Sequence, residues 1–256
     1  MTSSTILSAA SYLGHLRAEG NQLADVADAA DLDRPVPTCP GWTVRDAVVH
    51  TGEVFAHKGA VLKLGRRPES GEWPVGPPAG TAPVKWYRQQ LDDLLTGLAE
   101  RDPTEPIWTW EPDSQHVGFW YRRMAHEVAV HRVDVEDGAG VPIAPLPAAL
   151  VADGVDELLT AFASGDWGSD DDDPALTGQR VDVRAGQHRW TVTLQRRRLD
   201  TTPGATEGAE AWVRCPDAQQ VLLYLWGRRS TEGIDRGGDP MALEGFRRRL
   251  YLVTSD

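Results

Sequence analysis

The sequence predicts two successive domains, a four-helix bundle over residues 1–140 and a small α+β domain over residues 146–256. Three observations lead to this fold class. Apolar residues in the first half recur mainly every three or four positions, as they do on one face of a helix. The segment GAGVPIAPLP at 138–147 is rich in glycine and proline and is typical of a linker. After it, residues 181–194 alternate apolar and polar side chains around a glycine, which indicates a β-hairpin.

The elements of the first half follow from this spacing. Helices are expected over residues 6–26, 43–64, 84–98 and 117–137. Thr43 and Asp46 have the spacing of a capping box, in which a hydroxyl and a carboxylate accept bonds from free backbone N–H groups at a helix start. The stretches at 33–42 and 67–83 are rich in proline and glycine, so we expect loops there. Four helices with long connections are a common bundle architecture.

The second half mixes both kinds of structure. Besides the hairpin, we expect a helix over 148–164, a strand over 209–215, a helix over 218–228 and a last helix from Asp239-Pro240 to Tyr251. Asp217 is a good N-cap for the helix that follows it. The acidic run at 170–173 lacks the spaced ligands and the glycine of a calcium-binding loop, so we interpret it as a solvated loop.

Composition excludes several classes of function. The chain has 38 acidic and 26 basic residues and a net charge of -12, whereas a nucleic-acid binder needs a basic face to displace counterions. No apolar run approaches the ~20 residues of a membrane-spanning helix, and the first twenty residues are too interrupted for a signal peptide. Two cysteines do not suggest a disulfide scaffold. We therefore expect a cytoplasmic protein that binds neither nucleic acid nor membrane. The oligomeric state is not readable from the sequence.

The chemistry is expected on the fourth helix. Its apolar seam includes Met124, Val128 and Val135, and His131 occupies a position where this pattern asks for an apolar residue. Glu127 lies four residues before His131, so both side chains project from one face, a turn apart. A carboxylate beside a buried seam is costly unless it is neutralised. A divalent cation would neutralise it, and carboxylate with imidazole is a ligand set suited to zinc.

The segment HEVAVH is not the metalloprotease motif, because His126 and His131 are five residues apart, about 500° of helical rotation. A third ligand is therefore expected from a facing helix. We prefer His50, which interrupts an apolar stripe in the capped part of the second helix. The rival is His57, which lies four residues after Glu53. Two interpretations of Asp134 are open. It either accepts a hydrogen bond that orients an imidazole, or it is a surface carboxylate paired with a nearby arginine.

Two segments together resemble the mycothiol-dependent maleylpyruvate isomerase family, part of the DinB-like group of metal-binding four-helix bundles. They are TCPGWTVRDAVVH at 38–50 and RRMAHEVAVHRVDVE at 122–136. The segment at 221–246 is similar to the C-terminal domain of that family. The resemblance implies a zinc site made by His50, Glu127 and His131, and mycothiol as a low-molecular-weight thiol cosubstrate. It also implies an active-site arginine from the C-terminal domain, which we match to Arg228, with Arg229 as the rival.

The expected mechanism is a metal-activated thiolate that attacks a small electrophile. Three protein ligands leave a coordination position open, as in catalytic zinc sites, and a cation favours the thiolate form of a thiol. If the adduct collapses after bond rotation, the enzyme is a cis–trans isomerase, and if it persists the enzyme is an S-transferase. Nickel or iron would fit the same ligands. The alternatives are a metal-bundle protein that binds a ligand without turnover, and a structural domain without metal.

Overall fold

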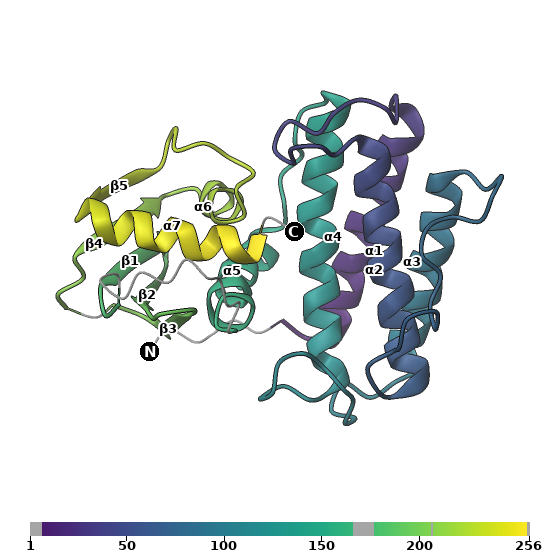
Figure 1. Ribbon diagram of the computed structural model, residues 1–256, viewed down its shortest axis with the longest axis horizontal. Coiled ribbons are helices and arrows are strands. Elements are labelled where there is room, and N and C mark those ends of the chain that lie inside the picture. The colour runs from purple at the N-terminus through teal and green to yellow at the C-terminus, as the bar shows by residue number, and fades with distance from the viewer. Residues whose placement is uncertain (1–6, 166–176, 206, 255–256) are drawn as a thin grey trace. The chain divides into compact units, whose positions relative to one another are not determined.

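The computed structural model describes residues 7–165, 177–205 and 207–254. Ile6 and the acidic run at 170–173 therefore lie outside the described residues. Contacts divide the chain between Ala144 and Pro145 into an N-terminal and a C-terminal unit (Figure 1). The fold class predicted from the sequence, a helical bundle followed by a small α+β domain, is confirmed.

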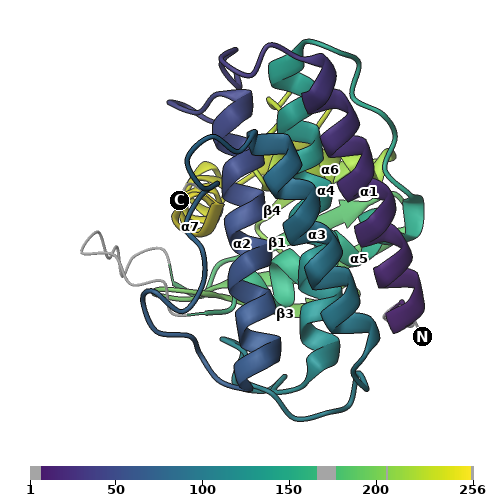
Figure 2. The same ribbon diagram turned by 90° about the vertical axis from the view of Figure 1, so that its right-hand side faces the viewer.

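The N-terminal unit consists of four long helices with loops between them. They are α1 (Ala9–Ala29), α2 (Val44–Leu64), α3 (Pro83–Ala99) and α4 (Val117–Ala139). The helices run side by side as a bundle (Figure 2). α2 and α3 approach closely at Gly52, where an added Cβ would lie 2.4 Å from the Trp86 ring. A larger residue at position 52 would therefore push these two helices apart.

Local signals fix where α2 begins and ends. The Thr43 side chain accepts from the Asp46 backbone N–H, and the Asp46 carboxylate accepts from the Thr43 N–H at 2.7 Å, which confirms the capping box. The helix ends at Gly65, whose φ of 70° lies in the left-handed region that glycine adopts without steric cost. This rigid start holds the segment of α2 that carries His50.

α4 packs mainly against α1 and α2, and it is buried on more sides than its apolar seam predicts. Four charged residues outside the seam are less than 4% exposed: Arg123, Arg132, Asp134 and Glu136. Arg132 is fully buried and donates to Glu19 of α1 and, at 2.6 Å, to Glu136. It also donates to the Ala144 carbonyl at 3.2 Å. These bonds tie α1, α4 and the start of the following segment together.

The C-terminal unit contains a five-stranded sheet in the order β3-β2-β1-β4-β5. The strands are β1 (Arg180–Ala185), β2 (His188–Leu194), β3 (Leu199–Pro203), β4 (Ala211–Cys215) and β5 (Asp235–Gly238). β1 and β4 are parallel, and the other neighbours are antiparallel. The predicted hairpin is β1–β2, with Ala185 paired with His188 across the turn. Alternate residues such as Val181 and Val183 are fully buried, so one face of the sheet packs against helices.

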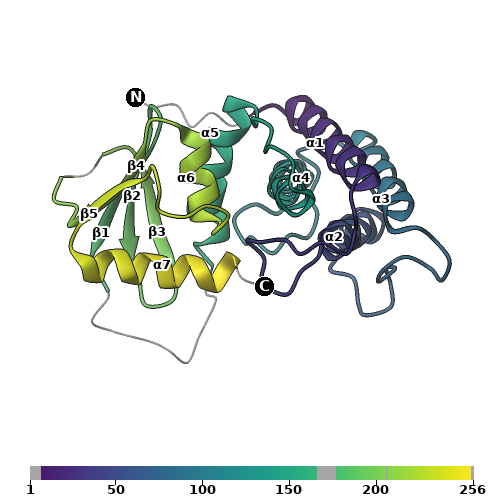
Figure 3. The ribbon, with the colours of Figure 1, turned by 90° about the horizontal axis from the view of Figure 1, so that it is seen from above.

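The helices of this unit are α5 (Ala148–Glu157), α6 (Ala218–Leu225) and α7 (Pro240–Thr254). α6 and α7 both contact β1 and β4, and α7 also contacts β2 and β5 because it crosses the strands (Figure 3). The helix expected over 148–164 is α-helical only to Glu157 and continues as a π-helical turn, Leu158–Phe162. Asp217 caps α6 as predicted, because its carboxylate accepts from the Gln219 N–H at 2.9 Å. Within the described residues, no helix is both long and apolar enough to cross a membrane.

Candidate metal centre

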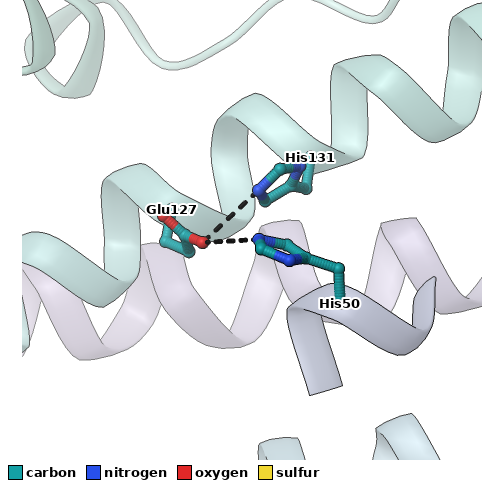
Figure 4. A group of neighbouring side chains, drawn as sticks. All are labelled: His50, Glu127 and His131. Carbon is teal, nitrogen blue, oxygen red and sulfur yellow. Dashed lines mark ion pairs between the residues drawn. The ribbon is translucent and has the colours of Figure 1, made fainter. Parts of the chain in front are cut away.

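Three side chains from two helices converge in the N-terminal unit. Glu127 and His131 come from α4 and His50 from α2 (Figure 4). Glu127 Oε1 lies 3.3 Å from His131 Nε2 and 3.6 Å from His50 Nε2. One ligand atom from each residue lies within 4.8 Å of the other two. The structure therefore brings together the three residues that the sequence analysis selected as ligands.

His57, the rival ligand, and His126, the other histidine of HEVAVH, lie elsewhere. The His57 ring packs edge-on against Trp73, at 4.7 Å between centroids, and its Nδ1 accepts from Lys58. The His126 ring points toward α1 and lies 6.2 Å from the Tyr12 ring. Neither joins the group of side chains around Glu127. Glu127 and His131, the pair on α4 that helical spacing selected, both lie in this group, and their role as metal ligands stays a prediction.

Two neighbouring residues of α4, Asp134 and Arg123, fix the side chains of His131 and Glu127 through hydrogen bonds. His131 Nδ1 lies 2.9 Å from Asp134 Oδ2, which leaves Nε2 toward Glu127. Arg123 donates to Glu127 Oε2 at 2.7 Å, which leaves Oε1 toward the two imidazoles. Asp134 is fully buried, so the reading in which it orients an imidazole is correct and the surface reading is wrong. Such contacts behind ligand side chains fix a tautomer and raise ligand basicity.

These contacts determine the charges of the group. Burial disfavours the charged form of His131, but hydrogen bonds to Asp134 and Glu127 outweigh it and raise its pKa to about 9. Burial likewise opposes ionisation of Glu127, yet bonds to His131 and His50 and the charge of Arg123 hold its pKa well below the usual value. Without a cation, a proton on His131 compensates the carboxylate. A cation that binds here takes over the role of that proton.

An aromatic wall covers one side of the group. The Trp42 ring lies 4.8 Å from the His50 ring and stacks on the His131 ring at 6.0 Å. Trp42 belongs to the loop before α2, whose backbone is fixed by bonds from Trp42 N to the Cys39 carbonyl and from Val36 N to the Trp42 carbonyl. A tryptophan here excludes water from part of the site and restricts both imidazoles.

The donor set fits a small divalent cation. Zinc bonds of about 2.0–2.2 Å to nitrogen and oxygen place the donor atoms of a tetrahedral site about 3.3–3.6 Å apart. The two measured separations from Glu127 Oε1 lie in this range. Three side chains complete only part of a tetrahedral shell, so one position is left for a small molecule. His50 is 35% exposed, which gives such a molecule access from solvent.

Comparisons with known proteins identify the family of the N-terminal unit and the fold of the chain. Residues 13–136 match the family model for the mycothiol maleylpyruvate isomerase N-terminal domain. The N-terminal unit of the chain belongs to this family of domains. The segments at 38–50 and 122–136 that carry the resemblance both lie within the matched residues. No curated protein sequence matches the chain significantly.

Two solved structures share the fold of the isomerase family. One is the crystal structure of the mycothiol-dependent maleylpyruvate isomerase, with a TM-score of 0.64. The other is a histidine-to-alanine mutant of the mycothiol-dependent maleylpyruvate isomerase, with a TM-score of 0.63. Each covers 93% of this chain and 97% of its own, at 14% identity. At this identity the likeness shows the fold.

The arginine that the isomerase family suggested lies in the C-terminal unit, after α6. Arg228 is 9% exposed, and its Nη1 donates to the Trp226 carbonyl at 2.8 Å and to the Thr254 carbonyl at 3.3 Å. Arg229 is exposed. A contribution of Arg228 to the active site therefore remains a prediction.

Sequence reasoning missed Arg123 as part of the site. Its position four residues before Glu127 was a usable signal, because an arginine and a glutamate at this spacing pair on a helix. Arg123 was overlooked because an arginine on this helix was expected at the surface, whereas the Arg123 side chain is 3% exposed.

Proposed function

We propose that this protein is a zinc-dependent enzyme that uses mycothiol to attack a small electrophilic substrate. The observation that carries the proposal is the convergence of His50, Glu127 and His131 on one point. The family match and the mycothiol-dependent isomerase of the same fold support the choice of thiol. The chemistry of the group supports the choice of metal, because two imidazoles and a carboxylate are frequent zinc ligands.

When bound, zinc would lower the pKa of an entering thiol, so that the thiolate forms near neutral pH. The protein's own residues prepare the place for it. Asp134 and Arg123 fix the direction of the ligand atoms. Trp42 shields the imidazoles from water on one side. The charge of Glu127 is balanced in part by Arg123, which limits the negative charge that an anionic thiolate meets.

The thiolate forms a carbon–sulfur bond to the electrophile, and the electron pair of the attacked double bond moves onto the electron-withdrawing group that is conjugated with it. If rotation is followed by loss of the same thiolate, the double bond returns as the other isomer and the thiol is not consumed. If the adduct takes up a proton, or a leaving group departs, the thiol is consumed and the reaction is an S-transfer. The shared step is attack by sulfur, so we propose a mycothiol-dependent isomerase or S-transferase.

The test uses the full-length protein and two histidine variants. We expect close to one zinc per chain in the wild type and mycothiol-dependent conversion of at least one member of a panel of unsaturated acids, epoxides and halides. The variant His131→Ala should lose the metal and the activity. His116→Ala, the same change at an exposed histidine at the start of α4, should keep both.

Two results would contradict the proposal. Tight zinc binding without conversion of any electrophile would favour the metal-bundle protein that binds a ligand without turnover. Absence of metal, with activity or without it, would remove the cation from the function altogether.

A further inference from the structure

A groove of about 490 Å³ lies on the N-terminal unit, along the face of α2 that is opposite to the metal group. Its volume is within the usual range of sites for small molecules. Gly59, which lines the groove, is nine residues after His50, and this spacing corresponds to about 900° of helical rotation, or about two and a half turns. The groove is therefore separate from the residues that the proposed enzyme uses.

Two helices and the loop between them form the groove. α2 and α3 run side by side (Figure 2), and the loop contributes Trp73 to the wall. The loop is fixed by Glu72, whose carboxylate oxygens accept from Arg66 at 2.7 and 2.8 Å and from the Glu69 N–H at 2.6 Å. The Trp73 ring also packs edge-on against His57, at 4.7 Å between centroids. A stretch that the sequence marks only as a loop thus forms a wall in a defined position.

The floor of the groove is apolar and open. It includes Ala56, Gly59 and Ala60 of α2. A Cβ added at Gly59 would meet no atom within 4 Å, so packing does not require a glycine at this position. Because glycine inside a helix is less stable than alanine, the chain keeps this floor open at the expense of helix stability. Leu64, also in the lining, is 42% exposed, and an apolar ligand in the groove would remove this surface from water.

Two opposite charges in the lining are left for a ligand. Glu72 is not one of them, because its oxygens bond to Arg66, which is the main reason that its pKa is lowered to about 2. The two are Lys63 on α2 and Asp93 on α3. Within the described residues neither side chain forms an ion pair, and Asp93 Oδ1 accepts from the neutral Gln89 amide at 2.9 Å. The groove thus offers an ammonium from one helix and a carboxylate from the other.

We propose that this groove binds an α-amino acid with a large apolar side chain. Lys63 pairs with the α-carboxylate of the ligand, and Asp93 pairs with its α-ammonium. The apolar side chain of the ligand covers the open floor beside the Trp73 ring. A simple acid would leave Asp93 without a partner, and a simple amine would leave Lys63 without one. A zwitterion with an apolar side chain therefore complements both charges and the floor.

The first experiment measures binding of L-phenylalanine to the full-length protein by ligand-observed NMR. We expect the wild type to bind it, and Gly59→Leu, which fills the groove, to weaken binding by more than about tenfold. Because the new side chain enters open space and leucine favours a helix, the Tm of Gly59→Leu should be unchanged or higher. Gly14→Leu makes the same change at an exposed glycine of α1 that also has no atom within 4 Å of an added Cβ, and should bind as the wild type does.

The second experiment compares L-phenylalanine with phenylalaninamide, which lacks the carboxylate, and with phenylpropionate, which lacks the ammonium. We expect Lys63→Met to weaken phenylalanine about two- to fivefold and to leave phenylalaninamide unchanged. Asp93→Asn should weaken phenylalanine by a similar factor and leave phenylpropionate unchanged.

Three results would overturn the proposal. The first is a wild type that does not bind phenylalanine, or binds it as tightly as Gly59→Leu does. The second is equal affinity of the wild type for all three probes, because the two charges then select nothing. The third is a wild-type dimer, seen by light scattering, that Gly59→Leu dissociates while no amino acid binds, because a second copy of the chain then occupies the groove.

Discussion

Asp134 is the residue through which the account can be tested without touching a ligand. It is fully buried, and its Oδ2 lies 2.9 Å from His131 Nδ1. Asp134→Asn preserves the size of the side chain and removes the charge that makes His131 a stronger base. Loss of such a contact behind a ligand weakens metal binding about 10- to 100-fold, or about 1.4–2.7 kcal/mol. The assay is competition for zinc with a chromophoric chelator at fixed pH.

A matched control is available one turn further along α4. Asp137 is partly exposed and its carboxylate lies 3.5 Å from Thr38 Oγ1, away from the imidazoles. We expect Asp137→Asn to bind zinc within about twofold of the wild type, and circular dichroism to show both variants folded. If Asp134→Asn binds zinc as tightly as Asp137→Asn does, Asp134 does not support a ligand and the reasoning is refuted.

Two further expectations concern protons and one concerns the bundle. Because the pKa of His131 is about 9 without metal and zinc needs the neutral imidazole, zinc binding at pH 7 should release about one proton from it and tighten between pH 7 and 9. Calorimetry in two buffers measures this, and affinity independent of pH would contradict it. The raised pKa also stabilises the metal-free fold by about 3 kcal/mol below pH 6.5, a contribution lost as pH rises through about 9. Urea unfolding of wild type and His131→Ala at pH 6.5 and 9.5 tests this, and the same pH dependence in both would contradict it. Arg132→Ala leaves Glu19 and Glu136 buried without their arginine partner and should lower the free energy of unfolding by about 3–5 kcal/mol. Arg88→Ala breaks exposed ion pairs between α3 and α1 and should lower it by less than about 1 kcal/mol. Equal losses of unfolding free energy in these two variants would refute the claim that burial makes the Arg132 ion pairs the stronger ones.

The parts of the molecule that were predictable from the sequence depend on neighbours along the chain. The capping box of Thr43 and Asp46 and the turn between Glu127 and His131 are local patterns with a fixed geometry. They set the start of α2 and the common face of two side chains on α4. The choice of His50 over His57 also rested on its place in α2, and the structure brings His50 into the group.

The parts that were missed depend on contacts between distant segments. β3 and β5 lie at the edges of the sheet, and β5 contains Asp-Arg-Gly-Gly, which has no apolar residue to mark a strand. Backbone pairing with β4 makes it a strand. Arg132 reads as a surface residue in the sequence, yet Glu19 from another helix allows it to be buried. A periodic pattern along one helix carries no information about such partners.

The central claim is that one cation binds His50, Glu127 and His131 and leaves room for a sulfur atom. X-ray absorption at the zinc edge tests it directly on zinc-loaded protein with and without mycothiol. We expect only nitrogen and oxygen ligands at about 2.0–2.2 Å without the thiol, and one added sulfur at about 2.3 Å with it. A spectrum that mycothiol leaves unchanged would contradict the claim.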